Sequence, residues 1–535
     1  NNAAMYHSIS STKGDDAIPK YDTRDVNETF MKNKDIKELI DSTIRNIEHE
    51  LSENNDVNKA GEELLHLLHT EMKNKLREIK PPSHKRNNKL RQKPWWDESL
   101  QDLWRNVCNK EHTYLKSKNH GHKKRELRNL YTSARKDFDK ALRRAKSRYQ
   151  REQQLEIQTL SETDMVGFWK KVNKLGIGNQ RANLTPLAIE VNGNIETDIT
   201  QVLDRWKKDF STLYANPENP QLNHEHITLV EERLKQIKDI QATLPPDDEL
   251  NPNSMNCALT LEEVRKAVHG LKNNKATGID GVPAECLKNE VVVNILFKIY
   301  SYCFDKGVVP DQWLKGIIHP IFKHGSVYDP LNYRSITLMN IICKCYSFIL
   351  NKRLCTWIEA NDILNDEQNG FRHARSCLDH MYVLYTIVKN RLLTKRSTYA
   401  CFIDAKKAFD RVNHNCLWYK LHNIGVRGKL WLALQSLYKQ GELMSSVRIN
   451  NMFTENFVIN CSVKQGDPTS PTLFALYMND LIDELNNVNE GIQCGNQTVS
   501  ALCYADDIVI LSETPTGTQR QFDIIDSWCK TLHII

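Results

Sequence analysis

The segment Tyr504-Ala505-Asp506-Asp507 constrains this chain more than any other feature of its sequence. Short apolar runs lie on both sides of it, residues 501–503 before and 508–511 after, which is typical of two strands joined by a tight turn. Two adjacent carboxylates at the tip of an apolar hairpin are costly unless a cation neutralises them. Mg²⁺ commonly binds one or two carboxylates together with substrate phosphates. The segment therefore predicts a hairpin with a divalent-metal site at its tip.

A third acid ends a second apolar run. Residues 399–403 form a continuous apolar stretch that predicts a buried strand, and Asp404 follows directly. An isolated Asp after a strand is more often a turn residue or a helix N-cap, and for Asp404 alone we favour that interpretation. Together with the Asp506-Asp507 pair, however, three aspartates at strand ends match a two-metal phosphoryl-transfer site. The three acids therefore indicate a nucleic-acid polymerase.

Length and composition set the class of protein. The 535 residues are enough for two to four domains, and a hydrophobic content of 40% supports real cores. The 14 cysteines show no C-x-x-C pairs, which favours reduced, mostly buried thiols in an intracellular protein. The most apolar stretch, residues 291–304, is too short to span a bilayer and predicts a core helix. The chain shows no signal peptide. It begins with Asn1 rather than Met, which suggests part of a longer protein.

Positive charge is concentrated in one block. Between Lys85 and Glu152 there are 21 Lys and Arg against 8 Asp and Glu, whereas the whole chain has a net charge of only +6. Such a block is typical of a surface that binds a phosphate backbone, although a solvated helical face is the commoner explanation of a charge run. Aromatic residues interleave with the charge and favour nucleic acid; they are Trp95, Trp96, Trp104, Tyr114, Tyr131 and Tyr149.

Periodicity and turn residues predict the organisation of the chain. We expect a mostly disordered or helical segment over residues 1–90, with disorder up to about residue 30 and a linker at 81–88. Residues 91–250 predict a basic helical region with a small hairpin at Asn192-Gly193. Four helices are expected in this region. Three span about 123–160, about 198–214 and about 225–240. The fourth begins at a capping box formed by Ser161 and Asp164 and continues through residue 172. Residues 255–535 predict a mixed α and β domain.

Six motifs from about residue 258 onward, in this order, closely resemble the reverse transcriptases of non-LTR (LINE-type) retrotransposons. They are residues 273–283 (NNKATGIDGVP), 319–338 (HPIFKHGS followed by NYRSITL), 367–372 (EQNGFR), 402–410 (FIDAKKAFD), 463–471 (VKQGDPTSP) and 504–507 (YADD). The resemblance covers about half of the chain. It implies a right-hand polymerase with fingers and palm, and Asp404, Asp506 and Asp507 as catalytic metal ligands.

The resemblance also implies a set of nucleotide-binding residues. Lys323 and Arg334 would clamp the incoming triphosphate, because Arg offers a bidentate fork and Lys a point charge. Phe409 would act as a gate beneath the sugar that excludes a ribose 2′-hydroxyl. Gln465 and Gly466 would position template and nucleotide, with Gly466 allowing close backbone approach before a helix. Taken singly, the cations would be assigned to surface ion pairs and Phe409 to the core.

The sequence departs from the family pattern at a few positions. Ser335 replaces a usual Pro, Cys377 a usual Thr, and Asp467 a smaller or apolar residue, and none of these changes removes a metal ligand. The segment 93–174 resembles the basic linker that follows the family's endonuclease. We expect the remaining palm motifs and the thumb to lie beyond Ile535, so the chain alone could be weakly active or inactive.

The sequence as a whole predicts an α+β right-hand polymerase preceded by a mainly helical basic region. The expected reaction is RNA-templated addition of deoxynucleotides to a primer 3′-hydroxyl, with two Mg²⁺ ions, or Mn²⁺ in their place, during retrotransposon replication. The expected partners are template RNA, primer or target DNA and deoxynucleoside triphosphates. A membrane is not expected, and the expected location is the nucleus, the cytoplasm or both. The alternatives are a group II intron-type or telomerase-like enzyme, a non-catalytic or domesticated RNA-binding remnant, and, less favoured because of Phe409, a viral RNA polymerase.

Overall fold

The computed structural model describes residues 20–24, 26, 30–32, 34–79, 93–117, 121–174, 185–215, 224–241 and 255–532. The chain divides into two compact units. One comprises Asn1–Lys80 together with Thr185–Ile535, and the other comprises Pro81–Leu184. These units differ from the domain boundaries expected near residues 90 and 250, because the N-terminal helices and the segment after residue 185 pack into the core of the larger unit.

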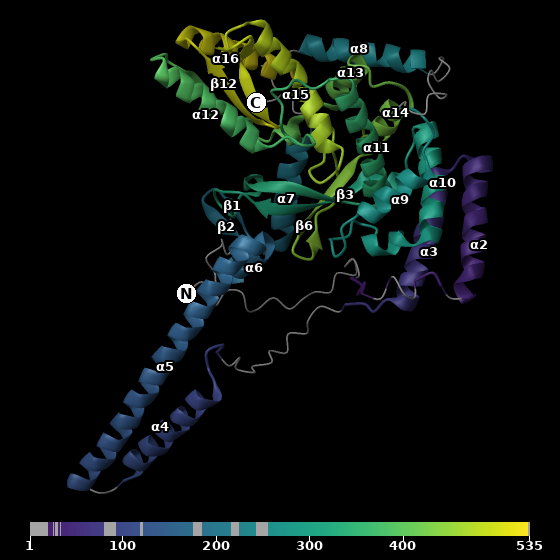
Figure 1. The fold of residues 1–535 in the computed structure, drawn as a ribbon. Coiled ribbons are helices and arrows are strands. Elements are labelled where there is room, and N and C mark those ends of the chain that lie inside the picture. The colour runs from purple at the N-terminus through teal and green to yellow at the C-terminus, as the bar shows by residue number, and fades with distance from the viewer. Residues whose placement is uncertain are drawn as a thin grey trace. The chain divides into compact units, whose positions relative to one another are not determined.

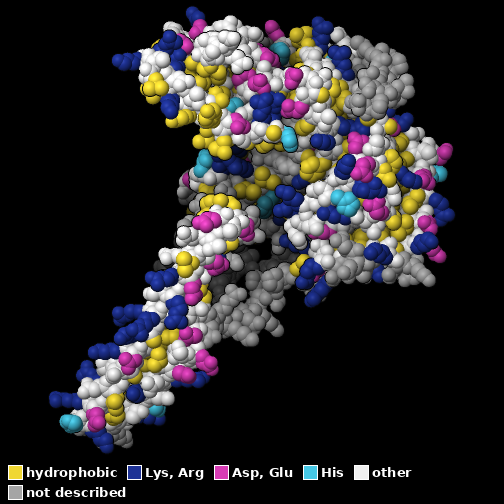
Figure 2. Space-filling view, viewed as in Figure 1, with side chains coloured by type: hydrophobic (Ala, Val, Ile, Leu, Met, Phe, Trp, Pro, Cys, Tyr) yellow, Lys and Arg dark blue, Asp and Glu magenta, His cyan; other side chains and the backbone are white. Residues whose placement is uncertain are grey.

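The smaller unit consists of α4 (Glu98–Lys116), α5 (His122–Thr163) and α6 (Met165–Lys174). Leu100 and Val107 of α4 pack on Ala134 and Phe138 of α5. Helices α4 and α5 lie side by side as a helical hairpin (Figure 1), and many Lys and Arg side chains lie on the face of it that Figure 2 shows. The aromatic residues that interleave with the positive charge pack against one another within this unit. Trp96 and Trp104 pack on Phe138, Trp95 on Tyr149, and Tyr114 on Tyr131.

The long helix expected over about 123–160 is confirmed by α5, but the capping box expected at Ser161 is wrong. Helix α5 continues through Thr163, and the Ser161 hydroxyl donates to the Gln158 carbonyl inside the helix at 2.6 Å. The further helix does exist, and it begins after Asp164. The helical hydrogen bonds of α5 continue past Ser161, so no helix begins at that residue.

The larger unit begins with a helical layer. Its elements are α2 (Lys34–His49), the π-helical turn η1 (Glu50–Asn54) and α3 (Val57–Lys75), and α3 packs on α10 (Glu290–Lys306). The expectation of disorder up to about residue 30 is wrong where it can be checked, because Phe30 is only 1% exposed and belongs to the core. Residues 1–19 and the expected linker 81–88 lie outside the described residues.

The β-hairpin and two helices expected before residue 250 are confirmed. Strands β1 (Ile189–Val191) and β2 (Asn194–Glu196) pair in antiparallel fashion. Asn192 and Gly193 both have positive φ, 51° and 80°, as a type I′ turn requires. The two helices are α7 (Ile199–Tyr214) and α8 (His224–Gln241).

The remaining helical elements of this unit surround two sheets (Figure 1). They are α9 (Leu261–Gly270), η2 (Ala284–Lys288), η3 (Asp311–Leu314), η4 (Pro330–Asn332), α11 (Ile341–Ala360), α12 (Cys377–Leu393), η5 (Ala408–Arg411), α13 (His414–Asn423), α14 (Gly428–Ser436), α15 (Ser470–Asn487) and α16 (Pro515–Leu532). The predicted apolar helix over 291–304 is α10, whose inward face is fully buried. Among the described helices, none is long and apolar enough to cross a bilayer. None of the 14 cysteines forms a disulfide bond.

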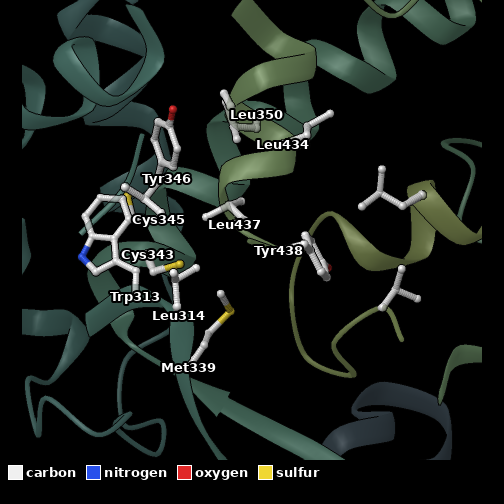
Figure 3. Packing of buried hydrophobic residues seen from close by; sticks show 14 of the residues in the cluster. Trp313, Leu314, Met339, Cys343, Cys345, Tyr346, Leu350, Leu434, Leu437 and Tyr438 are labelled. Carbon is white, nitrogen blue, oxygen red and sulfur yellow. The ribbon is translucent and has the colours of Figure 1, made fainter. Parts of the chain in front are cut away.

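A five-stranded mixed sheet forms one half of the scaffold. It runs in the order β4 (Tyr333–Met339), β3 (Lys315–Phe322), β6 (Met444–Ile449) and β7 (Met452–Phe453), with β8 (Phe457–Val458) also on β6. Strand β3 is antiparallel to β4 and parallel to β6. Beside it, Trp313, Tyr346, Leu434 and Tyr438 interdigitate in a dense apolar core (Figure 3).

The second sheet has three antiparallel strands in the order β11 (Ala501–Tyr504), β12 (Asp507–Ser512) and β5 (Tyr399–Asp404). A small hairpin of β9 (Ile492–Cys494) and β10 (Gln497–Val499) precedes it. The strand predicted over 399–404 is confirmed, but its predicted burial is wrong. Strand β5 is paired only with β12 among the described strands, and Phe402 is 72% exposed. Apolar composition cannot distinguish an edge strand from a central one.

Candidate active site

The three predicted acids meet at one end of the three-stranded sheet. Asp404 is the last residue of β5 and Asp507 the first of β12, and the two are direct cross-strand partners. Tyr504 pairs with Asp507, so Ala505 and Asp506 form the hairpin turn, with Ala505 at φ 59°. The predicted hairpin is therefore confirmed, and register alone brings Asp404 beside the pair.

The electrostatics of these acids favour a cation between them. Burial raises the pKa of Asp506, and the negative charges of Asp507 and Asp404 raise it further, while Lys323 acts in the opposite direction. Asp404 and Asp507 are both exposed at the surface. The group therefore carries excess negative charge in a place that solvent and substrate can reach.

A buried glutamine supports the hairpin turn from behind. Gln368 is fully buried, and its Oε1 accepts from the Ala505 N–H at 2.9 Å and from the Gly370 N–H at 2.9 Å. Gly370 lies so close that an added Cβ would collide with the Ala505 backbone nitrogen. The segment around Gln368 thus holds the turn residue next to Asp506 in its left-handed conformation.

A histidine and an asparagine fix the strand that leads into this turn. The Cys503 carbonyl accepts from the Asn369 N–H at 3.0 Å and from His380 Nε2 at 3.0 Å. His380 Nδ1 in turn accepts from the Asn369 side-chain amide at 3.2 Å. The Cys503 N–H donates to the Glu367 carbonyl at 2.8 Å. Segment 367–369 therefore pairs with β11 at the end that leads to the acids.

The two predicted phosphate-binding cations lie on one face of the β3–β4 hairpin. Ile321 pairs with Arg334, and the Lys323 N–H donates to the Asn332 carbonyl at 3.0 Å, so alternation places Lys323 and Arg334 on the same face. Both side chains are exposed. Because Lys323 lowers the pKa of Asp506, its ammonium group lies within electrostatic reach of that carboxylate.

Phe409 belongs to an aromatic group beside the acids. Its ring stacks on Phe474 of α15 with the centroids 4.4 Å apart, and Phe371 lies 6.4 Å from both Phe409 and Tyr504. Phe371 is 55% exposed and has φ 62°, a rare conformation for so large a side chain. Phe409 is half-buried and packs against the core.

Gln465 and Gly466 lie against the strand that carries Arg334. The Thr337 N–H donates to the Gln465 carbonyl at 2.7 Å. Gly466 has φ 123°, and a Cβ there would approach the Thr337 carbonyl oxygen to 2.7 Å. Asp467 accepts from the N–H and the hydroxyl of Thr469, each at 2.9 Å, at the start of α15. The unusual Asp467 thus stabilises the loop that presents Gln465.

The donor set suits hard divalent cations, because all three side chains offer carboxylate oxygens. Within the described part of the chain, no three His, Cys, Asp or Glu side chains form a group that could hold a metal ion by itself. Mg²⁺ keeps several ligands from water and substrate phosphates, so it does not require three protein side chains in one group. Asp404, Asp506 and Asp507 are the residues that would hold it.

The polar residues that support the site are not among those that the sequence predicts. Gln368, Asn369 and His380 carry no chemistry of their own, and their contacts with residues 503 and 505 span more than 120 positions. The one available signal was the motif EQNGFR at residues 367–372. Its Arg372 forms a two-pronged ion pair with Glu359, at 3.1 and 2.9 Å, and donates to the Asn365 carbonyl.

Comparison with known proteins agrees with this geometry. Residues 321–535 match the family model described as reverse transcriptase (RNA-dependent DNA polymerase). The chain is 26% identical over 337 residues to a probable RNA-directed DNA polymerase from transposon BS of Drosophila melanogaster, an alignment that covers 61% of this chain and 36% of that protein. It is 24% identical to the RNA-directed DNA polymerase from mobile element jockey of the same organism, over 52% of this chain and 30% of that protein.

A further relative is the Pol polyprotein from retrotransposable element R2DM of Drosophila melanogaster, 27% identical over 50% of this chain and 24% of that protein. The chain thus spans only about a quarter to a third of the length of these relatives. Among solved structures, an apo telomerase from Candida tropicalis aligns with 41% of this chain and 47% of its own at 13% identity, with a TM-score of 0.30 that is too low to support an argument. The motifs, the family model and the relatives together assign to the C-terminal end of this chain the reverse transcriptase domain of a non-LTR retrotransposon.

Proposed function

We propose that the chain is an RNA-directed DNA polymerase that adds deoxynucleotides to a primer 3′-hydroxyl on an RNA template during retrotransposon replication. The observation that carries this proposal is the position of the three acids. Asp404 and Asp507 are direct cross-strand partners, and Asp506 lies in the adjoining turn. That arrangement presents carboxylates from two strands at one exposed point. The proposal assigns the five-stranded sheet to the fingers and the three-stranded sheet to the palm.

The acids would hold the two metal ions, Mg²⁺ or Mn²⁺. When bound, such ions lower the pKa of the attacking hydroxyl and offset the charge that develops on the phosphates. Asp404 and Asp507 project from strand ends whose backbone hydrogen bonds fix their spacing. The buried contact of Gln368 with Ala505 keeps Asp506 in place beside them. The chain thus provides a preorganised site, in which alignment supplies much of the rate.

The exposed cations on β3 and β4 would bind the triphosphate. Lys323 and Arg334 face the same side of their hairpin, so both can neutralise phosphate oxygens. The Phe409 ring, fixed by stacking on Phe474, would close the space beneath the sugar and disfavour a 2′-hydroxyl. Gln465 and Gly466 would contact the nascent base pair from the loop before α15.

The proposed partners are template RNA, a DNA primer or target and deoxynucleoside triphosphates. The basic surface of the α4–α5 hairpin supports an additional contact with a phosphate backbone (Figure 2). We place the protein inside the cell, in the nucleus, the cytoplasm or both, and the 14 cysteines, none of which forms a disulfide bond, suit a reducing compartment. A catalytically incomplete or domesticated RNA-binding remnant is the second candidate, because the same basic surface would bind RNA without any contribution from the three acids (Figure 2).

Primer extension on an RNA template tests the proposal. The chain is supplied with Mg²⁺ and either deoxy- or ribonucleotides, beside a variant carrying Asp506→Asn and Asp507→Asn. Deoxynucleotide-dependent extension that the variant lacks would support the polymerase. A chain that binds RNA in a filter assay, yet extends no primer under any nucleotide or metal condition, would support the remnant instead.

A further inference from the structure

A buried carboxylate lies directly beside the proposed sugar gate. Asp410 follows Phe409 in η5 and is only 5% exposed. Its Oδ1 accepts from the Ser335 hydroxyl at 2.9 Å and from the Tyr214 hydroxyl at 3.1 Å. Ser335 and Tyr214 are themselves 2% and 3% exposed. The three side chains form a buried polar contact, and the charges of Lys407 and Arg411 also act on the Asp410 carboxylate.

The contact joins three elements that are distant in sequence. Tyr214 is the last residue of α7, Ser335 lies in β4 next to Arg334, and Asp410 lies in η5 next to Phe409. Tyr214 is 196 positions from Asp410 and stands outside the segment 321–535 that matches the family model. Asp410 therefore links two elements to η5, which carries Phe409. One is α7, and the other is β4, which carries Arg334.

The short helix η5 depends on such external contacts. It has only four residues, too few to hold its own orientation through internal hydrogen bonds. Lys407, at its start, has φ 54°, a conformation that L-residues adopt at a cost. The backbone of η5 is fixed by the Val463 N–H, which donates to the Phe409 carbonyl at 2.9 Å, and by Cys461 Sγ, 3.5 Å from the Asp410 carbonyl. The Asp410 side chain supplies hydrogen bonds that anchor this turn to β4 and α7.

Phe409 and Asp410 are joined by one peptide bond, so a shift of the Asp410 backbone also moves Phe409. Loss of both hydroxyl donors would leave a buried carboxylate without hydrogen bonds, which is costly and favours movement toward water. Such movement would tilt the Phe409 ring away from Phe474, on which it stacks at 4.4 Å. Misplacement by about 1 Å is enough to change a reaction rate by orders of magnitude.

We propose that Asp410, held by Ser335 and Tyr214, is a positioning residue that sets the Phe409 ring and thereby the selection of deoxy- over ribonucleotides. The inference rests on the proposed polymerase function and extends it to a residue of α7. Asp410 touches neither the metal ligands nor the nucleotide in this account. It acts through the backbone of η5.

The test compares Tyr214→Phe and Ser335→Ala with two matched controls. Tyr300→Phe removes an equally buried hydroxyl that donates to the Ile342 carbonyl at 2.7 Å, and Ser436→Ala removes one that donates to Ala433 at 2.7 Å. The readout is the ratio of kcat/KM for a deoxynucleotide to that for the matching ribonucleotide. We expect this ratio to fall about tenfold in each network variant and to stay at the wild-type value in both controls.

Two variants of Asp410 distinguish an effect on the position of Phe409 from an effect on the stability of the whole protein. Asp410→Asn keeps an acceptor oxygen for both hydroxyls, so it should retain most of the selectivity, whereas Asp410→Leu keeps the volume without the acceptor and should lose it. Unchanged selectivity in Tyr214→Phe and Ser335→Ala would overturn the proposal. An equal loss in the Tyr300→Phe and Ser436→Ala controls would also overturn it, because it would reveal a global effect.

Amide hydrogen exchange over residues 405–412 gives a readout that needs no polymerase activity. Tyr214→Phe should accelerate exchange of this peptide severalfold, and Tyr300→Phe should not. Exchange at the wild-type rate in Tyr214→Phe would show that the network does not fix η5. If the wild-type chain extends no primer while exchange responds as expected, the polymerase assignment fails and the anchoring of η5 stands.

Discussion

Replacement of Gln368 by Met should damage catalysis more than stability alone explains. Met has a similar volume but no strong acceptor, so Gln368→Met leaves two buried N–H groups, those of Gly370 and Ala505, without the oxygen that each reaches at 2.9 Å. An orphaned buried donor costs about 1–3 kcal/mol, so the variant should lose about 2–6 kcal/mol of unfolding free energy. Since Ala505 adjoins Asp506, we also expect kcat to fall at least about tenfold with little change in KM.

The same sheet offers a matched control. Gln521 is also fully buried, and its amide donates to the carbonyls of Ser500 and Leu511, at 3.2 and 3.1 Å, at the opposite end of β11 and β12. Gln521→Met therefore also removes two hydrogen bonds to the backbone. Denaturant unfolding should show comparable destabilisation of the two variants, whereas primer extension below the unfolding transition should separate them.

Two results would refute this reasoning. Wild-type kcat in a destabilised Gln368→Met variant would show that the hairpin keeps its catalytic geometry without the brace. An equal fall of kcat in Gln521→Met would show that activity follows the stability of the sheet as a whole. Hydrogen exchange over residues 503–507 locates the effect, because only Gln368→Met should increase opening at the turn.

Three further predictions concern other parts of the molecule. Phe409→Val should lower discrimination against ribonucleotides about tenfold or more in single-nucleotide extension assays, and Leu432→Val, at a partly exposed site on α14, should leave it unchanged. Burial lowers the pKa of His414 from 6.5 to about 4, so the unfolded chain binds the proton more readily. Stability should therefore fall by about 3 kcal/mol as the pH drops from about 6.5 to about 4, and denaturant titrations of His414→Gln should lack this part of the loss. On α5, the triple change Lys136→Glu, Lys140→Glu and Arg144→Glu should weaken RNA binding and reduce the salt slope of log K by about two to three; an unchanged slope would contradict a phosphate contact there.

Local patterns were sufficient to predict most helices and the hairpin that carries Asp506 and Asp507. Helix α5 and the Asn192-Gly193 turn follow from periodicity and turn chemistry that involve only neighbouring residues. The acids were found because paired carboxylates on apolar strands have few structural explanations. The α+β class is confirmed. The capping box at Ser161 failed because a short motif competes with the cooperative continuation of a long helix.

Burial and long-range contacts could not be predicted in this way. The apolar run at residues 399–403 has the composition of a central strand, and only the assembled sheet shows that β5 is paired on one edge among the described strands. The contact of Tyr214 with Asp410 spans 196 positions, and that of Gln368 with Ala505 spans 137. Single-sequence reasoning compares neighbours, so it has no means of detecting either.

The same physical reason explains why the acids can be predicted from motifs, whereas the residues in these two contacts cannot. A metal-binding carboxylate must be exposed to its ligand, so its type and spacing are constrained by chemistry and are visible in the sequence. A supporting side chain must instead be buried and fully satisfied, because an unpaired polar group in the core costs more than a good hydrogen bond contributes. The carboxylate oxygen Oδ1 of Asp410 and the amide oxygen Oε1 of Gln368 meet that condition through partners in other elements. The precision of this site therefore depends on residues whose identity has meaning only in the folded chain, and substitutions there should alter kcat or nucleotide choice while all three aspartates remain in place.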